Sequence, residues 1–132
     1  MDEREFKDRT KLIALRIIRV LEALPKSDTA RIIGKQLLRS GTSIGANYRA
    51  ACRGKSVADV LHKLAIVEEQ ADEALYWMEL LIESEIDAEQ KLALLKKDVN
   101  EIVAMIVASI RTLRAKRVSD PQSKIQNLKS KI

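Results

Sequence analysis

Apolar residues recur every three or four positions along most of the chain, which is the period of an amphipathic α-helix rather than of a strand. The pattern predicts four helices, at about residues 3–24, 28–53, 56–84 and 87–117. The buried stripe of the first is formed by Phe6, Ile13, Ile17, Val20, Leu21 and Leu24. The stripe of the last has nearly heptad spacing and comprises Leu92, Leu95, Val99, Ile102, Ile106 and Leu113.

The breaks between these segments carry helix start and stop signals. Pro25 ends the first helix, because proline lacks the amide donor that a continuing helix needs. Ser27 or Asp28 can cap the second helix, Ser56 opens the third with the spacing of a capping box, and Asp87 can cap the fourth. Links of a few residues force neighbouring helices to run antiparallel, so we expect an all-α, up-down-up-down four-helix bundle.

The bundle is expected to occupy residues 1–118 as one domain, followed by a basic tail at 119–132. Asp120 and Pro121 can start a short helix in this tail, and the alternative is a flexible segment. One face of that helix would carry Ile125, Leu128 and Ile132.

Composition points to a cytoplasmic protein. The chain has no leading apolar segment and no stretch approaching the roughly 20 apolar residues that span a bilayer. Its single cysteine, Cys52, permits no intrachain disulfide, which fits a reducing compartment.

Charge is segregated along the sequence. Residues 25–55 hold seven Lys or Arg against one acidic residue, and residues 91–132 hold ten against three. Residues 56–90, by contrast, hold ten acidic residues and a single Lys, while the whole chain has a net charge of +5. The third helix should therefore be acidic, and the second helix and the end of the fourth basic. These faces could pair with one another or remain exposed to partners.

Catalytic or metal chemistry has little support in the sequence. Asp59 and His62 could share a helix face, but His62 is the only histidine, and a di-metal bundle site needs ligands from several helices. Arg49 and Arg53 could lower the pKa of Cys52, yet no base is close in sequence. No phosphate-binding loop or nucleophile elbow occurs. We expect no enzyme activity, no catalytic residue, no metal site and no cofactor.

Two segments are candidates for packing and assembly. Small and polar residues concentrate within the second helix, where we expect a helix-packing motif formed by Ser40, Ser43, Ile44 and Asn47, with ligand contact as the alternative. Ser43 and Asn47 could bond each other or a facing helix. Tyr76 and Trp77 are expected at an oligomer interface, and the first helix carries a second set of apolar residues, Leu12, Leu15 and Ile18.

The motifs QLLRSGTSIGANYR (residues 36–49) and KLAIVEEQADEALYWMELL (residues 63–81) resemble a known family. They are similar to the small four-helix bundle proteins encoded within intervening sequences of bacterial 23S rRNA genes. The resemblance covers about residues 6–114, and it departs from the family pattern at Ala50, where a glutamate usually follows Asn-Tyr-Arg. It implies a homopentameric ring, similar in fold to the nucleic-acid-binding accessory protein of diversity-generating retroelements.

Charge and resemblance together suggest a homo-oligomer that binds RNA or other nucleic acid. The residues expected to contact phosphates are Arg39, Arg49, Arg53, Lys55, Arg111, Arg114, Lys116 and Arg117. The alternative is an adaptor or scaffold ring that docks a protein partner on the acidic third helix.

Overall fold

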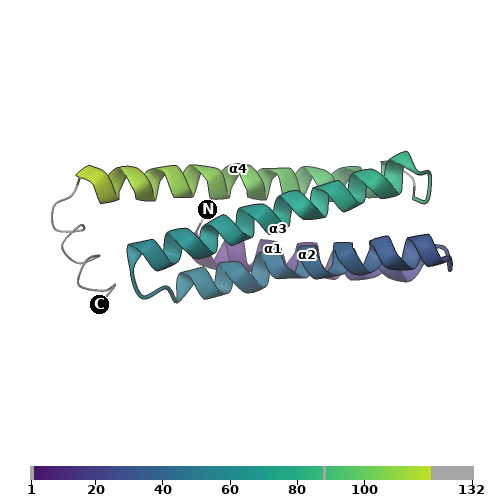
Figure 1. Ribbon diagram of the computed structural model, residues 1–132, viewed down its shortest axis with the longest axis horizontal. Coiled ribbons are helices and arrows are strands. Elements are labelled where there is room, and N and C mark those ends of the chain that lie inside the picture. Colours follow the sequence, from purple (N-terminus) through teal and green to yellow (C-terminus); the bar gives the residue numbers. More distant parts are fainter. Residues whose placement is uncertain (1, 88, 120–132) are drawn as a thin grey trace.

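The computed structural model describes residues 2–87 and 89–119, which form an elongated antiparallel four-helix bundle (Figure 1). The helices are α1 (Glu3–Ala23), α2 (Asp28–Cys52), α3 (Val57–Glu83) and α4 (Glu89–Ser119). The expected all-α, up-down-up-down architecture is confirmed, and each predicted boundary lies within two residues of the observed one. The tail expected to be flexible or helical falls, apart from Ser119, outside the described residues.

Capping side chains set the starts of the helices. Ser27 Oγ accepts a hydrogen bond from the amide of Ala30 at 3.1 Å, and Ser56 Oγ accepts one from the amide of Asp59 at 3.0 Å. The Asp59 carboxylate accepts from the amide of Lys55 at 3.0 Å, one residue before the partner that an ordinary capping box would use. These bonds satisfy amide groups that a helix end leaves without internal partners.

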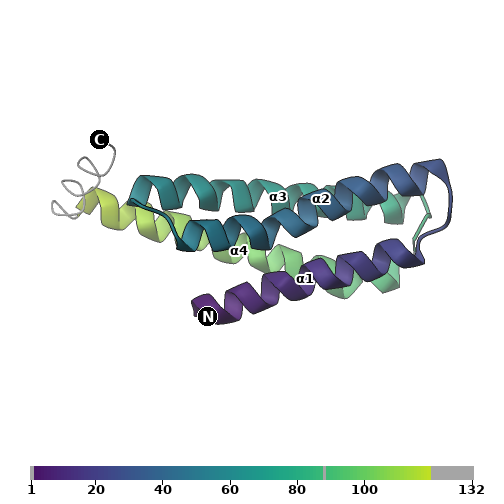
Figure 2. The same ribbon diagram turned by 90° about the horizontal axis from the view of Figure 1, so that it is seen from below.

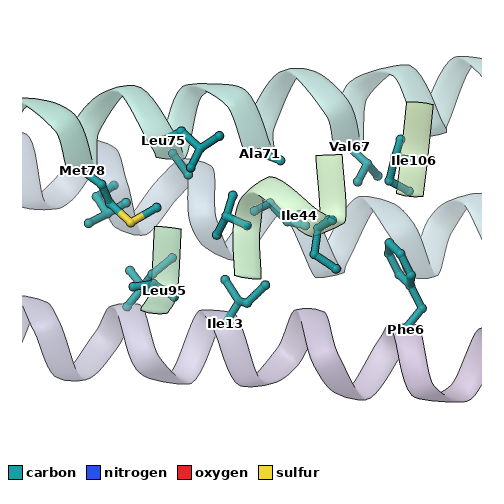
Figure 3. Packing of buried hydrophobic residues seen from close by; sticks show 14 of the residues in the cluster. Phe6, Ile13, Ile44, Val67, Ala71, Leu75, Met78, Leu95 and Ile106 are labelled. Atoms are coloured by element: carbon teal, nitrogen blue, oxygen red, sulfur yellow. The ribbon is translucent and has the colours of Figure 1, made fainter. Parts of the chain in front are cut away.

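Apolar stripes from all four helices meet in one continuous core (Figure 3). Ile13 and Ile17 of α1 are almost fully buried, as are Leu37 and Ile44 of α2. The α3 and α4 contributions are larger and include Val67, Ala71, Ala74, Met78, Leu81, Leu92, Leu95, Val99, Ile102 and Ile106. Burial of these side chains provides the main stabilisation of the fold, because each aliphatic side chain removed from water contributes about 1.5–3 kcal/mol.

Two residues of the predicted packing motif, Ser40 and Ile44, lie on the inner side of α2, whereas Ser43 and Asn47 are half-buried. Ser40 and Ile44 are completely buried, and Ser40 Oγ donates to the carbonyl of Gln36 at 2.9 Å. Asn47 Nδ2 donates to the carbonyl of Ser43 at 2.8 Å, so its partner is neither the Ser43 side chain nor another helix. The polar side chains of this segment thus form hydrogen bonds to backbone carbonyls in the preceding turn of α2. Because its hydroxyl is bonded in this way, Ser40 can be buried among apolar neighbours.

Charged side chains bridge α1 and α4, which diverge toward the amino end of α1 (Figure 2). Asp98 on α4 pairs with Arg9 at 3.4 Å and also with Arg16. Arg9 additionally pairs with Glu101 and lies 3.9 Å from the Met105 sulfur. The two arginines therefore join α1 to α4, which pack against each other less extensively than α1 and α2 do.

Candidate nucleic-acid interface

The bundle topology brings the carboxyl ends of α2 and α4 to the same end of the molecule (Figure 1). Seven of the eight predicted phosphate-binding residues belong to these ends or to the link after α2. We call this set the basic end; it comprises Arg49, Arg53, Lys55, Arg111, Arg114, Lys116 and Arg117. All are exposed except Arg117, which is half-buried. Residues about 60 positions apart in sequence thus lie at the same end of the bundle, on two helices, α2 and α4, that do not contact each other.

Most of the basic end is not neutralised by acidic neighbours. Six of its side chains form no ion pair with any residue that the structure describes, namely Arg49, Arg53, Lys55, Arg111, Arg114 and Arg117. Basic residues at helix carboxyl ends are also favoured by the helix dipole, which accounts for part of this distribution.

Two acidic residues at the same end, Asp59 and Glu3, have other partners. Asp59 accepts from the Lys55 amide and pairs with Lys63 at 3.2 Å, and these bonds lower the pKa of the Asp59 carboxyl. Glu3 contacts the thiol of Cys52 and pairs with Lys7 at 3.4 Å, and both contacts lower the pKa of Glu3. Because Lys7 and Lys63 already balance these carboxylates, the positive charge of the basic end is left for a ligand or for solvent.

Arg39 does not join the basic end. It lies ten residues before Arg49 on α2, which corresponds to about 15 Å along the helix. Its guanidinium pairs with Glu73 of α3 and also bonds the side chains of Gln70 at 3.4 Å and Gln36 at 3.1 Å. Glu73 already balances the charge of Arg39, so we assign this arginine to the α2–α3 contact rather than to the unpaired cations of the basic end.

Glu73 also links Arg39 to the predicted interface residues Tyr76 and Trp77. The Trp77 indole Nε1 donates to Glu73 at 3.0 Å, and the Trp77 ring is half-buried against the core. Tyr76 meets the Trp77 ring edge-on at a centroid distance of 5.2 Å and remains 53% exposed. Of the two aromatic residues, Tyr76 therefore offers more surface for contact with another molecule. On α1, the predicted second apolar set of Leu12, Leu15 and Ile18 is exposed as well.

Cys52 is half-buried, and the possible lowering of its pKa by the neighbouring arginines does not occur. The pKa of the thiol is raised, chiefly by burial and then by the nearby Glu3 carboxylate. The thiol is thus a poor nucleophile at neutral pH. His62 is exposed, and no group of three or more His, Cys, Asp or Glu side chains within residues 2–87 and 89–119 is placed to hold a metal ion.

The pairing of Arg9 and Arg16 with α4 was not anticipated from the sequence. Their partners lie more than 80 residues away, and only the distance between α1 and α4 identifies which carboxylates they reach. None of the described helices is long and apolar enough to cross a membrane.

An antiparallel all-α bundle with a basic end places the chain in a class of small helical-bundle proteins. The profile of the 23S rRNA-intervening sequence protein family matches residues 3–108, and the chain belongs to this family. The match ends before Arg111, so the α4 part of the basic end lies beyond the matched residues.

A solved structure supports the same assignment. The chain is 37% identical to a protein of unknown function from the S23 ribosomal protein family of Bacteroides thetaiotaomicron, with a TM-score of 0.75. The similarity covers 80% of this chain and 97% of that protein. No curated protein sequence matches the chain.

Proposed function

We propose that this protein is a cytoplasmic, non-enzymatic homo-oligomer that binds nucleic acid, most favourably RNA, through its basic end. The observation that carries the proposal is the presence of six cationic side chains, unpaired within the described chain, at the end of the bundle where α2 and α4 finish. Such cations bind phosphates with little sequence specificity, because they read the backbone rather than base edges. The family name points in the same direction, since it refers to sequences within 23S rRNA genes.

A filter-binding assay tests the proposal: the affinity for a structured RNA is measured at several salt concentrations. Replacing Arg111 and Arg114 by Gln should weaken binding. It should also make the slope of log affinity against log salt concentration shallower, by about 0.7–0.9 for each phosphate that is no longer neutralised. The matched control replaces Arg19 and Lys35, two exposed cations toward the other end of the bundle, by Gln. Equal losses of affinity in both double variants would show that only net charge matters. Wild-type affinity weaker than about 10⁻⁴ M at physiological salt would rule out the proposal.

The oligomer part of the proposal rests on exposed apolar side chains. Leu12 is 51% exposed and Leu15 45%, on the face of α1 that points away from the core. Apolar residues grouped in this way favour burial against another subunit, and the family resemblance suggests five subunits. Sedimentation equilibrium should give a multiple of the 14.9 kDa chain mass, and Leu15→Glu should reduce it. A wild-type protein that remains monomeric at all concentrations would contradict this part.

The acidic face of α3 supports an adaptor as the second candidate function. Glu69, Asp72 and Glu79 are exposed and form no ion pair with the described residues, and the exposed ring of Tyr76 lies on the same helix. A partner bound there should survive nuclease treatment and should no longer bind when Glu69 and Asp72 are replaced by Lys. A partner released by nuclease treatment would instead favour the nucleic-acid proposal.

A further inference from the structure

An open groove of about 430 Å³ lies between α1 and α2. The two helices pack closely beneath it, since a Cβ atom added at Gly45 would lie 3.1 Å from Oγ1 of Thr10. Small side chains make up much of the lining, namely those of Ala14, Thr42 and Ala46. Because these side chains reach only a short way from their backbones, the groove has room for a side chain of another molecule.

Positive charge surrounds this groove. Lys7, Lys11 and Arg49 line it, against a single carboxylate, that of Asp8. Lys7 is balanced by Glu3 at 3.4 Å. Lys11 and Arg49, however, form no ion pair with any residue that the structure describes. The groove is therefore suited to a partner that carries carboxylates.

Exposed apolar side chains continue the same face of α1. Leu15 lies one helical turn after Lys11, and Ile18 lies one turn after Ala14. The two are 45% and 39% exposed. A partner that fits this surface should thus offer an apolar or aromatic side chain as well as negative charge.

The outer face of α3 has both properties. Five exposed residues follow one another there at alternating spacings of three and four positions and so form one stripe along the helix. We call it the acidic stripe; it comprises Glu69, Asp72, Tyr76, Glu79 and Glu83. None of its four carboxylates forms an ion pair within the described part of the chain. The Tyr76 ring lies at the middle of the stripe and is 53% exposed.

We infer that the acidic stripe of one copy of this chain docks into the α1–α2 groove of a second copy. Tyr76 enters the groove, and Glu69 and Asp72 face Lys11 and Arg49 of the partner subunit. A tyrosine that fills a pocket is a frequent anchor of protein interfaces, and complementary charges around it fix the orientation of the two partners. The inference rests on the homo-oligomer proposed above and names the two surfaces that join its subunits.

The two surfaces lie on different sides of the bundle. α2 packs against both α1 and α3, whereas α1 and α3 do not pack against each other. The acidic stripe also lies opposite the buried side of α3, which carries Val67, Ala71 and Met78. One copy therefore uses its stripe and its groove on two different neighbours. Head-to-tail contacts of this kind close into a ring or continue as a filament.

Charge reversal on each surface tests the inference. One variant carries Glu69→Lys and Asp72→Lys on the acidic stripe, and a second carries Lys11→Glu and Arg49→Glu at the groove. A third variant carries all four changes and so keeps the net charge of the wild type. Sedimentation equilibrium without nucleic acid gives the dissociation constant of each full-length chain, and circular dichroism at 222 nm checks that the helices are retained.

Each two-residue variant should have a dissociation constant roughly tenfold higher than the wild type, or more, because like charges then face each other. The four-residue variant should regain most of the wild-type assembly, since opposite charges face each other again.

Two-residue variants that assemble like the wild type would overturn the inference and leave the oligomer itself intact. A four-residue variant that remains dissociated would overturn it as well. A wild-type chain that is monomeric throughout would instead refute the oligomer on which the inference rests.

Discussion

Replacing Gly41 by Ala is expected to destabilise the protein, although alanine is the better helix former. A Cβ atom at Gly41 would lie 2.1 Å from Cδ1 of Ile17, well inside contact distance. Ile17 is fully buried, so its end cannot turn aside without displacing other core residues. Overpacking of this kind costs about 1–3 kcal/mol, and helix propensity returns about 1 kcal/mol, so the expected loss of stability is about 1 kcal/mol.

Gly34→Ala is the matched control on the same helix. Its added Cβ would lie 3.3 Å from Leu24 Cδ1 and 3.4 Å from Leu21 Cγ. Both leucines are only partly buried and can move by the few tenths of an ångström required. This variant should therefore gain up to about 1 kcal/mol from helix propensity.

A second substitution identifies the clash. Ile17→Val removes the Cδ1 atom and should by itself cost about 0.5–1.5 kcal/mol. In the double variant Gly41→Ala, Ile17→Val, the alanine methyl occupies the vacated space, so the two costs should not add. We expect a coupling free energy of about 1 kcal/mol or more in favour of the double variant.

Urea unfolding followed by circular dichroism at 222 nm, at one fixed protein concentration, measures the stabilities of the wild type and of the four variants. The reasoning is refuted if Gly41→Ala is as stable as Gly34→Ala. It is also refuted if the effects at Gly41 and Ile17 add to within about 0.5 kcal/mol, because independent sites behave in that way.

Three further predictions concern charge and pH. Asp98→Asn removes the shared partner of Arg9 and Arg16 and should lower the free energy of unfolding by about 1 kcal/mol. Urea unfolding in 1 M salt should show a smaller difference between this variant and the wild type, because ions screen the pairs. Burial raises the pKa of Tyr48 above its usual range, so its contribution to stability is intact below about pH 10 and lost as the pH rises further; thermal unfolding of Tyr48→Phe should show less of this alkaline loss. The lowered pKa of Asp59 stabilises the fold above about pH 4 and ceases to do so as the pH falls; unfolding of Asp59→Asn between about pH 5 and pH 3 should therefore depend less on acid, and an unchanged acid dependence would contradict the assignment.

The candidate site was only partly predictable. Arg49, Arg53 and Arg111 could be selected as basic residues near helix ends, and the alternating helix directions then bring them to the same end of the bundle. Arg39 is equally basic in sequence, but whether it pairs with Glu73 depends on the rotation of α2 against α3. Pairing across helices is a property of three-dimensional contact, so counting charges along the chain cannot identify it.

The apolar period and the capping residues by themselves determined four helices, their bounds to within two residues, and their antiparallel order. This follows because helix formation and short links are local properties, encoded within a few turns of chain. Only the tertiary structure decided how far each helix extends beside its neighbours. α1 begins beside Cys52 while α4 continues past that point, which leaves an open groove lined by Cys52. The packing of α1 against α4 selects Asp98 as the shared partner of Arg9 and Arg16. Such features depend on the relative positions of segments about 80 residues apart, which no local pattern specifies.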